Sequence, residues 1–344
     1  MKIALISYPM LFQRKGGLQI QILETLKALD SNSVDVHLFE ASREKLKNYD
    51  LIHVFSSING NHRIVEAAKE QNIPIVITPI IQTTDWTYWF SAKARLLDIL
   101  VGKLTNWSLR TNYQEVKSSM TNADHIFAGS GEEKWAISNA FDVHKEKISI
   151  VPIGVSEQFY TSTPELFRET FNFNKEFVLC AANISTYKNQ LSIVKALNNV
   201  NLDLVLLGGC DKRDSDYLDK CLNEGNGRVH YLGNIEHDNP VLASAYAAAS
   251  VSVLVSQGEN GPTVAYESLA AGTPVVVTKY NGLEMKKNDD VWRESDPYNV
   301  NEITNAILEL KDSLATTEMI RETVRDMSWN AIAKKLITGY KLLL

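Results

Sequence analysis

Short apolar runs alternate with longer stretches of helical spacing along the whole chain. A short continuous apolar run is typical of a strand buried on both faces, and apolar residues at every third or fourth position are typical of a helix. In the first half, strands are predicted at residues 3–6, 34–39, 51–55, 75–77 and 125–128, and helices at 20–29 and 64–70. In the second half, strands are predicted at residues 177–181, 204–207, 229–232, 251–255 and 275–277. The alternation predicts a doubly wound α/β architecture with two Rossmann-like units.

The predicted boundary between the two units lies near residues 148–155, Ile-Ser-Ile-Val-Pro-Ile-Gly-Val. There a short strand runs into Pro152 and Gly154, and the polar stretch 161–164 follows. The chain has 344 residues, which is enough for two domains of about 100 to 200 residues each. We therefore expect two domains that meet in this region.

Residues 251–278 read as strand, loop, helix and strand, and a single carboxylate stands out in the predicted helix. Pro262 is predicted to open the helix at its first position, and Gly272 is predicted to end it. From Pro262 to Thr278 the one charged side chain is Glu267. Burying a carboxylate is costly unless hydrogen-bond donors meet it, so Glu267 requires a partner, and ligand hydroxyls are a candidate.

A second carboxylate, Glu259, precedes Glu267 by eight residues and lies in the loop between strand and helix. In open parallel sheets, the loops at the carboxyl ends of strands bind ligands. The start of the following helix offers the amides of Gly261, Thr263 and Val264 and the positive end of its dipole, which suits a phosphate. Amides that bind an anion and two carboxylates that accept from hydroxyls together fit a phosphorylated sugar.

This segment resembles the signature block of family 4 retaining glycosyltransferases. The matching residues are Ser256, Glu259, Glu267, Ala270, Gly272, Pro274-Val275-Val276, Gly282 and Glu284. The resemblance implies a GT-B fold, in which two Rossmann-like domains face a cleft. It also implies an acceptor domain of residues 1–155 plus 328–344, because the C-terminal helix crosses back, and a donor domain of residues 156–327. The implied activity is metal-independent, retaining transfer of a sugar from a nucleoside diphosphate to an acceptor hydroxyl.

The resemblance also implies roles for individual residues. Glu259 would hold sugar hydroxyls near the reacting centre, and Lys188 would stabilise the departing phosphate. Glu267 would bind the ribose hydroxyls. Further residues expected to bind the donor are Asn260, Gly261, Thr263, Val264, Asn183, Leu232, Gly16 and Gly17. The substrate would be a nucleotide sugar of the UDP or GDP type, and neither a separate cofactor nor a metal is expected.

Five of these positions, Lys188 among them, lie outside the glutamate segment. Gly16 and Gly17 follow the first strand, where paired glycines let the backbone turn tightly and approach a ligand; a merely flexible turn is the alternative. Leu232 ends a strand at the position where relatives receive the nucleobase. Asn183 stands where relatives carry an arginine five residues before Lys188, so Lys188 and the helix amides would carry more of the developing charge.

Ile80 marks a second departure from the resembled family. Many relatives carry a histidine at this place, close to the 6-hydroxyl of the donor sugar. An apolar side chain would leave such a hydroxyl unpaired, so one hypothesis is a 6-deoxyhexose or pentose donor. A shifted alignment or another histidine, such as His62, explains the departure equally well.

Residues 86–110 combine aromatic, apolar and basic side chains. The cluster Trp86-Thr-Tyr-Trp-Phe90 precedes Leu97, Leu100, Val101, Leu104 and Trp107, and basic residues lie among them. This composition suits peripheral contact with a membrane that holds a lipid-linked acceptor. A helix packed on its own domain, or an acceptor pocket lined with aromatic residues, is the alternative.

Composition excludes several classes of function. The chain is 44% hydrophobic and 22% charged with a formal net charge of −6, and neither half is basic enough to suggest nucleic acid as a partner. Cys180, Cys210 and Cys221 are expected as buried free thiols. Asp214-Ser-Asp216 is read as helix-capping and solvated rather than as a metal site. The start of the chain is strand-like and does not resemble a signal peptide, so the cytoplasm is the expected compartment, with membrane association through residues 86–110 as an addition.

Three other functions share this gross architecture. A GT-B sugar-nucleotide epimerase would need several catalytic histidines or carboxylates in the cleft, which the sequence does not place there. A small-molecule binding protein of the periplasm would need an export signal. A catalytically silent nucleotide-sugar-binding homologue fits the missing arginine and histidine. The sequence favours a glycosyltransferase of polysaccharide or glycan assembly, acting on a glycan or lipid-linked acceptor.

Overall fold

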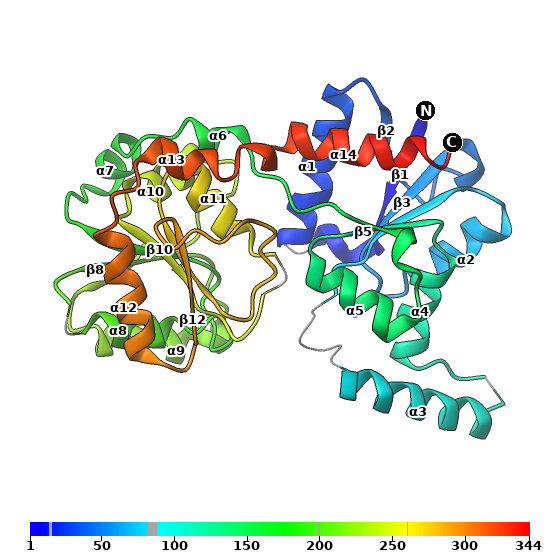
Figure 1. Ribbon diagram of the computed structural model, residues 1–344, viewed down its shortest axis with the longest axis horizontal. Coiled ribbons are helices and arrows are strands. Elements are labelled where there is room, and N and C mark those ends of the chain that lie inside the picture. The colour runs from blue at the N-terminus through cyan, green and yellow to red at the C-terminus, as the bar shows by residue number, and fades with distance from the viewer. Residues whose placement is uncertain (14–15, 82–87, 107, 199, 260) are drawn as a thin grey trace. The chain divides into compact units, whose positions relative to one another are not determined.

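The chain folds into two compact units in the computed structural model (Figure 1). The first contains Met1–Gly154, Gly282–Glu284 and Trp329–Leu344, and the second contains Val155–Asn281 and Met285–Ser328. The structure describes residues 1–13, 16–81, 88–106, 108–198, 200–259 and 261–344, with only the backbone of 88–90.

The first unit is built on a six-stranded parallel sheet in the order β2-β1-β3-β4-β5-β6. Its strands are β1 (Lys2–Ile6), β2 (Asp35–Leu38), β3 (Leu51–Phe55), β4 (Ile75–Thr78), β5 (His125–Ala128) and β6 (Ile148–Ile150). Every residue of β3, β4 and β5 is buried, as expected for strands covered on both faces. The strands predicted in this half are confirmed.

Helices cover both faces of the first sheet. They are α1 (Gly17–Ser31), α2 (His62–Glu70), α3 (Tyr88–Leu104), α4 (Asn112–Asn122), α5 (Gly131–Phe141) and α14 (Trp329–Lys341), with 3₁₀ turns η1 (Pro9–Gln13), η2 (Leu46–Asn48) and η4 (Lys145–Lys147). Apolar residues of α1 and α14 share one core cluster with the sheet. Residues of α2, α4 and α5 share the cluster on the other face.

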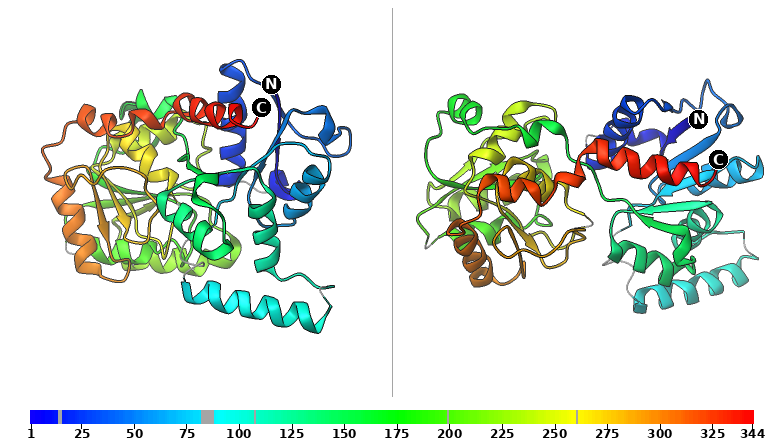
Figure 2. Two further views of the ribbon diagram at one scale, coloured as in Figure 1. Left: turned by 45° about the vertical axis from the view of Figure 1, so that its right-hand side comes forward. Right: turned by 45° about the horizontal axis from the view of Figure 1, so that its top comes forward.

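The C-terminal helix is held to the first unit by close contacts. It packs against α1, which the two views of Figure 2 show beside it. Gly154 lies directly against the ring of Trp329: a Cβ built on Gly154 would come within 2.3 Å of Trp329 Cδ2. At the other end of the helix, the Tyr340 hydroxyl lies 2.7 Å from His53 Nδ1 on β3. Residues from both ends of the sequence therefore build one core.

The second unit has a six-stranded parallel sheet in the order β12-β11-β10-β7-β8-β9. Its strands are β7 (Phe177–Ala181), β8 (Asp203–Leu207), β9 (Val229–Tyr231), β10 (Val251–Leu254), β11 (Val275–Thr278) and β12 (Trp292–Ser295). The edge strand β12 was not predicted. Its sequence Trp-Arg-Glu-Ser contains two charged residues, and it lacks the continuous apolar run on which the other strands were recognised.

Helices also cover both faces of the second sheet. They are α6 (Glu157–Tyr160), α7 (Glu165–Phe171), α8 (Gln190–Leu197), α9 (Ser215–Glu224), α10 (Pro240–Ala248), α11 (Thr263–Ala271), α12 (Val300–Lys311) and α13 (Thr317–Glu322), with 3₁₀ turns η5 (Lys212–Asp214) and η6 (Arg325–Met327). Residues of α8, α9 and α12 share one core cluster with the sheet. Helix α11 packs against α6, α10 and α13.

In each sheet, successive strands are added on one side of the first strand and then on its other side, so the strand order reverses at one point. In the second unit the chain runs outward from β7 to β8 and β9, and then returns to place β10 on the other side of β7. In the first unit the corresponding reversal lies between β1 and β3. The loops at the carboxyl ends of two such strands diverge and leave a crevice, which is where open α/β sheets bind ligands.

Three further observations bear on the sequence predictions. All three cysteines are free, as predicted, and Cys180 and Cys221 are buried, but Cys210 is only half-buried because it lies in the loop after β8, so its predicted burial was wrong. Among the helices that the structure describes, none is long and apolar enough to cross a membrane. The described part of the chain also holds no cluster of three or more His, Cys, Asp or Glu residues suited to a metal ion.

Candidate functional site

The candidate site lies at the reversal point of the second sheet, where the loops after β7 and β10 meet. Strands β7 and β10 are hydrogen-bonded neighbours, with Val251 paired to Val178. Because both strands run in the same direction, the loops that follow them leave the same edge of the sheet. The first loop carries Lys188 and the second carries Glu259.

A local turn places Lys188. The loop after β7 ends at Asn189, which has a left-handed backbone (φ 60°) and precedes α8. Its side-chain amide donates to Val255 O at 3.0 Å and to Pro297 O at 2.8 Å. Asn189 thus holds the loop that carries Lys188 against the end of β10. Asparagine is among the residues that tolerate a left-handed backbone.

The loop after β10 places Glu259. The Glu259 amide donates to Tyr280 O at 2.8 Å, which fixes this loop to the segment after β11. The Tyr187 hydroxyl donates to Gly258 O at 2.6 Å, and the Gln257 amide donates to Tyr187 O at 3.0 Å. The two loops are therefore bonded to each other next to both charged side chains.

Lys188 and Glu259 form an ion pair at this point. Lys188 Nζ lies 2.6 Å from Glu259 Oε1, and the Ser256 hydroxyl donates to the same oxygen. Their side chains are 26% and 14% exposed, so both are partly withdrawn from solvent yet reachable. A cation and a carboxylate held together in this way can face a ligand that carries both phosphate and hydroxyl groups.

The N-terminus of α11 adjoins Glu259. Pro262 is the N-cap and Thr263 the first helical residue, so the prediction that Pro262 is the first helical residue was wrong by one position. Gly261 has a left-handed backbone (φ 71°), which glycine adopts without strain. The first turn holds no acidic residue, so the amides of Thr263 and Val264 and the helix dipole leave a favourable place for an anion. Asn260 lies outside the described residues.

Glu267 lies in the second turn of α11 and is buried, with 3% of the residue exposed. His237 Nε2 lies 2.8 Å from its Oε1, and the Tyr246 hydroxyl donates to its Oε2 at 3.2 Å. Burial, followed by the neighbouring carboxylate, raises the pKa of Tyr246 well above its ordinary value, so this hydroxyl keeps its proton. The protein itself therefore supplies partners for the carboxylate that the sequence predicted to need one, and the binding of ligand hydroxyls by Glu267 stays a prediction.

His237 and Tyr246 were missed by the sequence analysis. His237 lies in the loop after β9, and Tyr246 lies in α10, thirty and twenty-one residues away from Glu267. Neither belongs to a recognisable motif. The one available signal was the lone carboxylate itself, because a buried charge predicts a donor near it without saying where in the sequence that donor lies.

Asn183 follows β7 and Leu232 follows β9, the two strands that lie on either side of β8 in the same sheet. Asn183 Oδ1 accepts from the Gly209 amide at 3.2 Å, which links the loops after β7 and β8. The Leu232 amide donates to Leu206 O at 3.1 Å, and Gly233 O accepts from Gly208 N at 2.9 Å. Asn183 is thus a loop-bridging residue in this structure and carries no charge that would replace the arginine of relatives.

In the first unit, Gly16 and Gly17 lead into α1, next to the reversal between β1 and β3. Gly16 has an extended backbone (φ 178°), and a Cβ on either glycine would meet no atom within 4 Å. The predicted approach of these glycines to a ligand stays a prediction. Arg14 and Lys15 lie outside the described residues.

Ile80 follows β4 and has a left-handed backbone (φ 54°), which is strained for a β-branched residue. The neighbouring Ile81 amide donates to Glu133 Oε1 at 2.8 Å. This bond holds the segment after β4 against α5. His62, the alternative histidine, is buried at the start of α2, and its Nδ1 lies 3.8 Å from Glu115.

The first side chain of the Asp-Ser-Asp segment at residues 214–216, that of Asp214, does not cap the helix that follows. Asp214 is the N-cap of α9, but its carboxylate makes no capping hydrogen bond and instead accepts from Arg213 Nε at 3.2 Å. The prediction that this side chain caps the helix was wrong, because the neighbouring guanidinium competes for the same carboxylate.

Residues 162–327 match the family model described as glycosyl transferases group 1. An uncharacterised glycosyltransferase of Methanocaldococcus jannaschii is 26% identical over 231 residues, which cover 61% of this chain and 57% of that protein. This chain thus spans little more than half the length of that curated relative.

Two solved structures share the fold. A sucrose-phosphate synthase from Thermosynechococcus elongatus has a TM-score of 0.78 at 20% identity, covering 99% of this chain and 98% of the other. Anabaena HepE, solved in complex with UDP, has a TM-score of 0.73 at 17% identity and 100% coverage of both chains. Together with the two six-stranded sheets, these similarities confirm the predicted GT-B fold.

Proposed function

We propose that this chain, whose residues 162–327 belong to the glycosyl transferases group 1, transfers a sugar from a nucleoside diphosphate to an acceptor hydroxyl. The observation that carries the proposal is the pairing of Lys188 with Glu259 at the reversal point of the second sheet. This is the family's matched region, and the pair supplies one group for phosphate and one for sugar hydroxyls. A solved structure of the same fold contains UDP.

Lys188 and the N-terminus of α11 would act on the leaving group. As the bond between the sugar and the diphosphate breaks, negative charge develops on the departing phosphate oxygen. An ammonium group and oriented amides held in place before the reaction stabilise that charge without reorganisation. Because Asn183 is uncharged, Lys188 would be the main side-chain cation for this task.

Glu259 would change partners when the donor binds. In the structure its carboxylate is occupied by Lys188 and Ser256. A bound diphosphate would compete for Lys188, which frees a Glu259 oxygen to accept from the sugar hydroxyls. Glu267, held in position by His237 and Tyr246, would accept from the ribose hydroxyls with the lone pairs that remain.

We further propose that transfer retains the configuration of the sugar and requires no metal. In this mechanism the acceptor hydroxyl attacks from the face that the phosphate leaves, and the departing phosphate oxygen takes its proton. The acceptor would be a glycan or a lipid-linked sugar in polysaccharide assembly. The apolar residue Ile80 supports a donor without a 6-hydroxyl.

Incubation with a panel of UDP-, GDP- and dTDP-sugars tests the proposal. Release of nucleoside diphosphate from one donor, slowed at least tenfold by Lys188→Ala, is the expected result. Conversion of one sugar nucleotide into another would identify an epimerase. Binding without turnover would identify a silent homologue, the alternative that the missing arginine suggested, and would overturn the proposal. If UDP-glucose or GDP-mannose clearly outcompetes deoxy and pentose donors, the inference from Ile80 is wrong.

A further inference from the structure

Helix α3 (Tyr88–Leu104) presents several large apolar side chains to solvent. From residue 91 onward, five of them are between 45% and 85% exposed: Leu96, Leu97, Ile99, Leu100 and Leu104. With 3.6 residues per turn these positions fall on one side of the helix. Scattered exposed leucines are normal, but five on one helix face form a patch that requires an explanation.

The opposite face of α3, which contacts the protein, consists mainly of small or polar residues. It is formed by the buried or half-buried residues Ser91, Ala94, Arg95, Asp98, Val101, Gly102 and Thr105. Helix α3 contacts α4 and α5 through this side. A surface helix of a globular protein normally buries its apolar stripe and exposes its polar face. Helix α3 has the reverse orientation.

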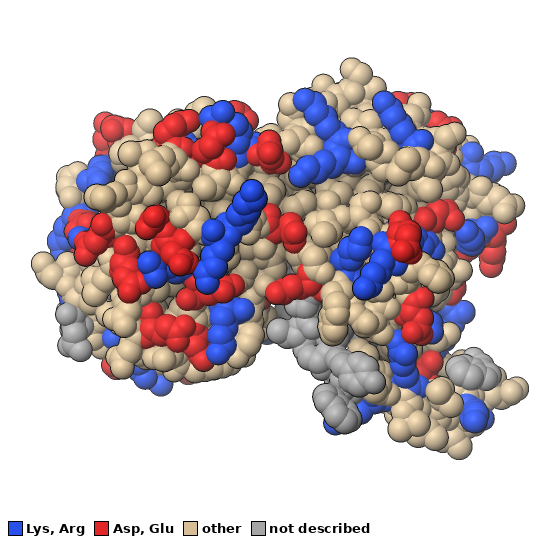
Figure 3. All heavy atoms as spheres, in the orientation of Figure 1, with Lys and Arg blue, Asp and Glu red and all other residues tan. Residues whose placement is uncertain are grey.

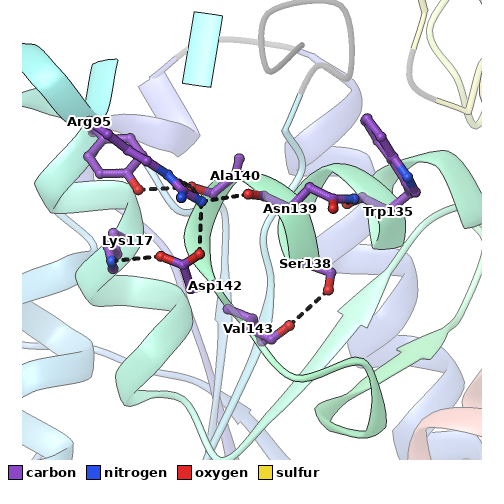
Figure 4. Close-up of polar contacts among 9 residues, drawn as sticks. Arg95, Lys117, Trp135, Ser138, Asn139, Ala140, Asp142 and Val143 are labelled. Atoms are coloured by element: carbon purple, nitrogen blue, oxygen red, sulfur yellow. Dashed lines mark hydrogen bonds and ion pairs between the residues drawn. The ribbon is translucent and has the colours of Figure 1, made fainter. Parts of the chain in front are cut away.

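Specific polar contacts hold the helix in this orientation, as Figure 4 shows. Arg95 Nη2 donates to Asn139 O at 2.6 Å and Ala140 O at 3.0 Å, at the C-terminal end of α5. The same nitrogen lies 2.9 Å from Asp142 Oδ1, and Lys117 lies 3.2 Å from the other oxygen of that carboxylate. A guanidinium is well placed against the free carbonyls at a helix C-terminus.

A second contact fixes the middle of the helix. The Thr111 hydroxyl, at the start of α4, donates to Asp98 Oδ1 at 2.6 Å. Asp98 is the only acidic residue of α3, and it is buried. Together with Arg95 it turns the polar face inward, and the leucines consequently point outward.

The charged residues on the exposed face are lysines. Lys93 and Lys103 are both exposed, and neither makes an ion pair with any residue that the structure describes. They project among the leucines on the outward side. In Figure 3, the edge of α3 at the lower right is mainly uncharged with isolated basic residues. The face is therefore apolar and positively charged, and it carries no acidic side chain.

We propose that α3 docks the protein onto an anionic lipid surface. The helix would lie in the interface, with the five apolar side chains in the acyl boundary and Lys93 and Lys103 against lipid phosphates. Its 17 residues span about 25 Å, which suits a helix lying flat. The proposal is independent of the transferase activity, although a membrane contact would bring the enzyme to a lipid-linked acceptor.

The charges favour a lipid surface over a second copy of the chain. In a two-fold dimer the same patch meets itself, so the lysines of one copy would be buried against those of the other. Like charges in that position oppose association. An anionic membrane instead provides an apolar phase for the leucines and negative headgroups for the lysines.

Flotation with vesicles tests the proposal. We expect binding to vesicles of phosphatidylcholine with phosphatidylglycerol at low salt, and at least tenfold weaker binding to phosphatidylcholine alone. Leu96→Ser with Leu100→Ser should lower binding to the anionic vesicles at least tenfold. Lys93→Glu with Lys103→Glu should remove the preference for anionic lipid. Leu314→Ser, at a residue that is 95% exposed in the other unit, is the matched control and should bind like the natural chain.

Circular dichroism and thermal unfolding should be unchanged in all these variants, because every substituted side chain is exposed. Absence of binding to the anionic vesicles, or equal binding by the leucine variant, overturns the proposal. A concentration-dependent dimer that the leucine variant abolishes would also overturn it and identify a second copy as the occupant. Donor hydrolysis measured without vesicles tests the catalytic proposal separately, so either can fail alone.

Discussion

Lys188 Nζ lies 2.6 Å from Glu259 Oε1 across 71 residues of sequence. The two side chains come from loops that follow neighbouring parallel strands, β7 and β10. Strand order brings the two side chains together, because β10 is the neighbour of β7 in the sheet although β8 and β9 lie between them in the sequence. The same relationship provides the first prediction.

Lys188→Ala should lower kcat/KM for the preferred donor about 10²- to 10³-fold, the loss typical of one preorganised electrostatic group. Lys188→Arg should retain part of the activity, because it keeps the charge but changes the geometry. Steady-state release of nucleoside diphosphate measures the effect. Lys195→Ala, which removes an exposed lysine of α8, is the control. An unchanged rate in Lys188→Ala would remove Lys188 from the mechanism.

Glu267→Gln should weaken binding of the free nucleoside diphosphate about 10- to 100-fold, the size of a lost hydrogen bond to a charged acceptor. The amide is similar in shape to the carboxylate but removes the charge that the ribose hydroxyls would meet. Isothermal titration calorimetry measures the affinity. His237→Ala, which removes a partner of Glu267, should weaken binding less. A lowered Tm with unchanged affinity for Glu267→Gln would assign Glu267 a purely structural role.

Gly154→Ala should destabilise the first unit by about 1 to 3 kcal/mol, the usual cost of overpacking. A Cβ at this position would come within 2.3 Å of Trp329 Cδ2, and the ring is held in the core with α14. Thermal and urea unfolding measure the change. Gly17→Ala is the matched control for stability, because its Cβ meets nothing within 4 Å. Equal melting of the two variants would contradict the close contact.

Acid should destabilise the protein through His53. Burial lowers the pKa of His53 to about 3, and its ring lies within hydrogen-bond distance of Tyr340 and Thr78. Because the unfolded chain binds the proton more tightly, with an ordinary pKa near 6.5, this contribution to stability is full above pH 7 and is lost as the pH falls from 6.5 towards 3. At pH 5 the loss should be about 2 kcal/mol.

Urea unfolding at pH 7.5 and pH 5 measures that loss. His53→Gln keeps a polar side chain and removes the titration, so its stability should depend less on pH over this interval. The comparison isolates His53 from His125, whose pKa is also lowered, chiefly by burial. If the two proteins lose the same stability between these pH values, His53 is not the group responsible.

EDTA should leave the rate of donor turnover unchanged, because Lys188 and the helix amides, rather than a metal, are proposed to stabilise the leaving phosphate. Dialysis against EDTA followed by assay with and without added Mg²⁺ or Mn²⁺ tests this. Loss of activity that returns with either ion would contradict the proposed mechanism.

The sequence by itself determined most of the architecture and part of the site. Continuous apolar runs such as 75–77 and 251–255 define buried strands because a strand covered on both faces requires apolar residues throughout. Glycine at position 272 ended α11, and its left-handed backbone (φ 86°) shows why. Strand β12 was not predicted because two charged residues interrupt its run of apolar residues.

Only the tertiary structure decided which distant residues meet. It joined Lys188 to Glu259, and it surrounded Glu267 with His237 and Tyr246, which no local pattern identifies. It also decided the orientation of α3: the sequence left open whether residues 86–110 contact a membrane or pack on their own domain, and the contacts of Arg95 and Asp98 turn the polar face of the helix inward. The periodicity of apolar residues depends on residues that are close in the sequence, so it can be read from the sequence directly. Which distant residues come into contact, and which face of a helix points inward, depends on how separate elements pack, so these features appear only in the folded structure.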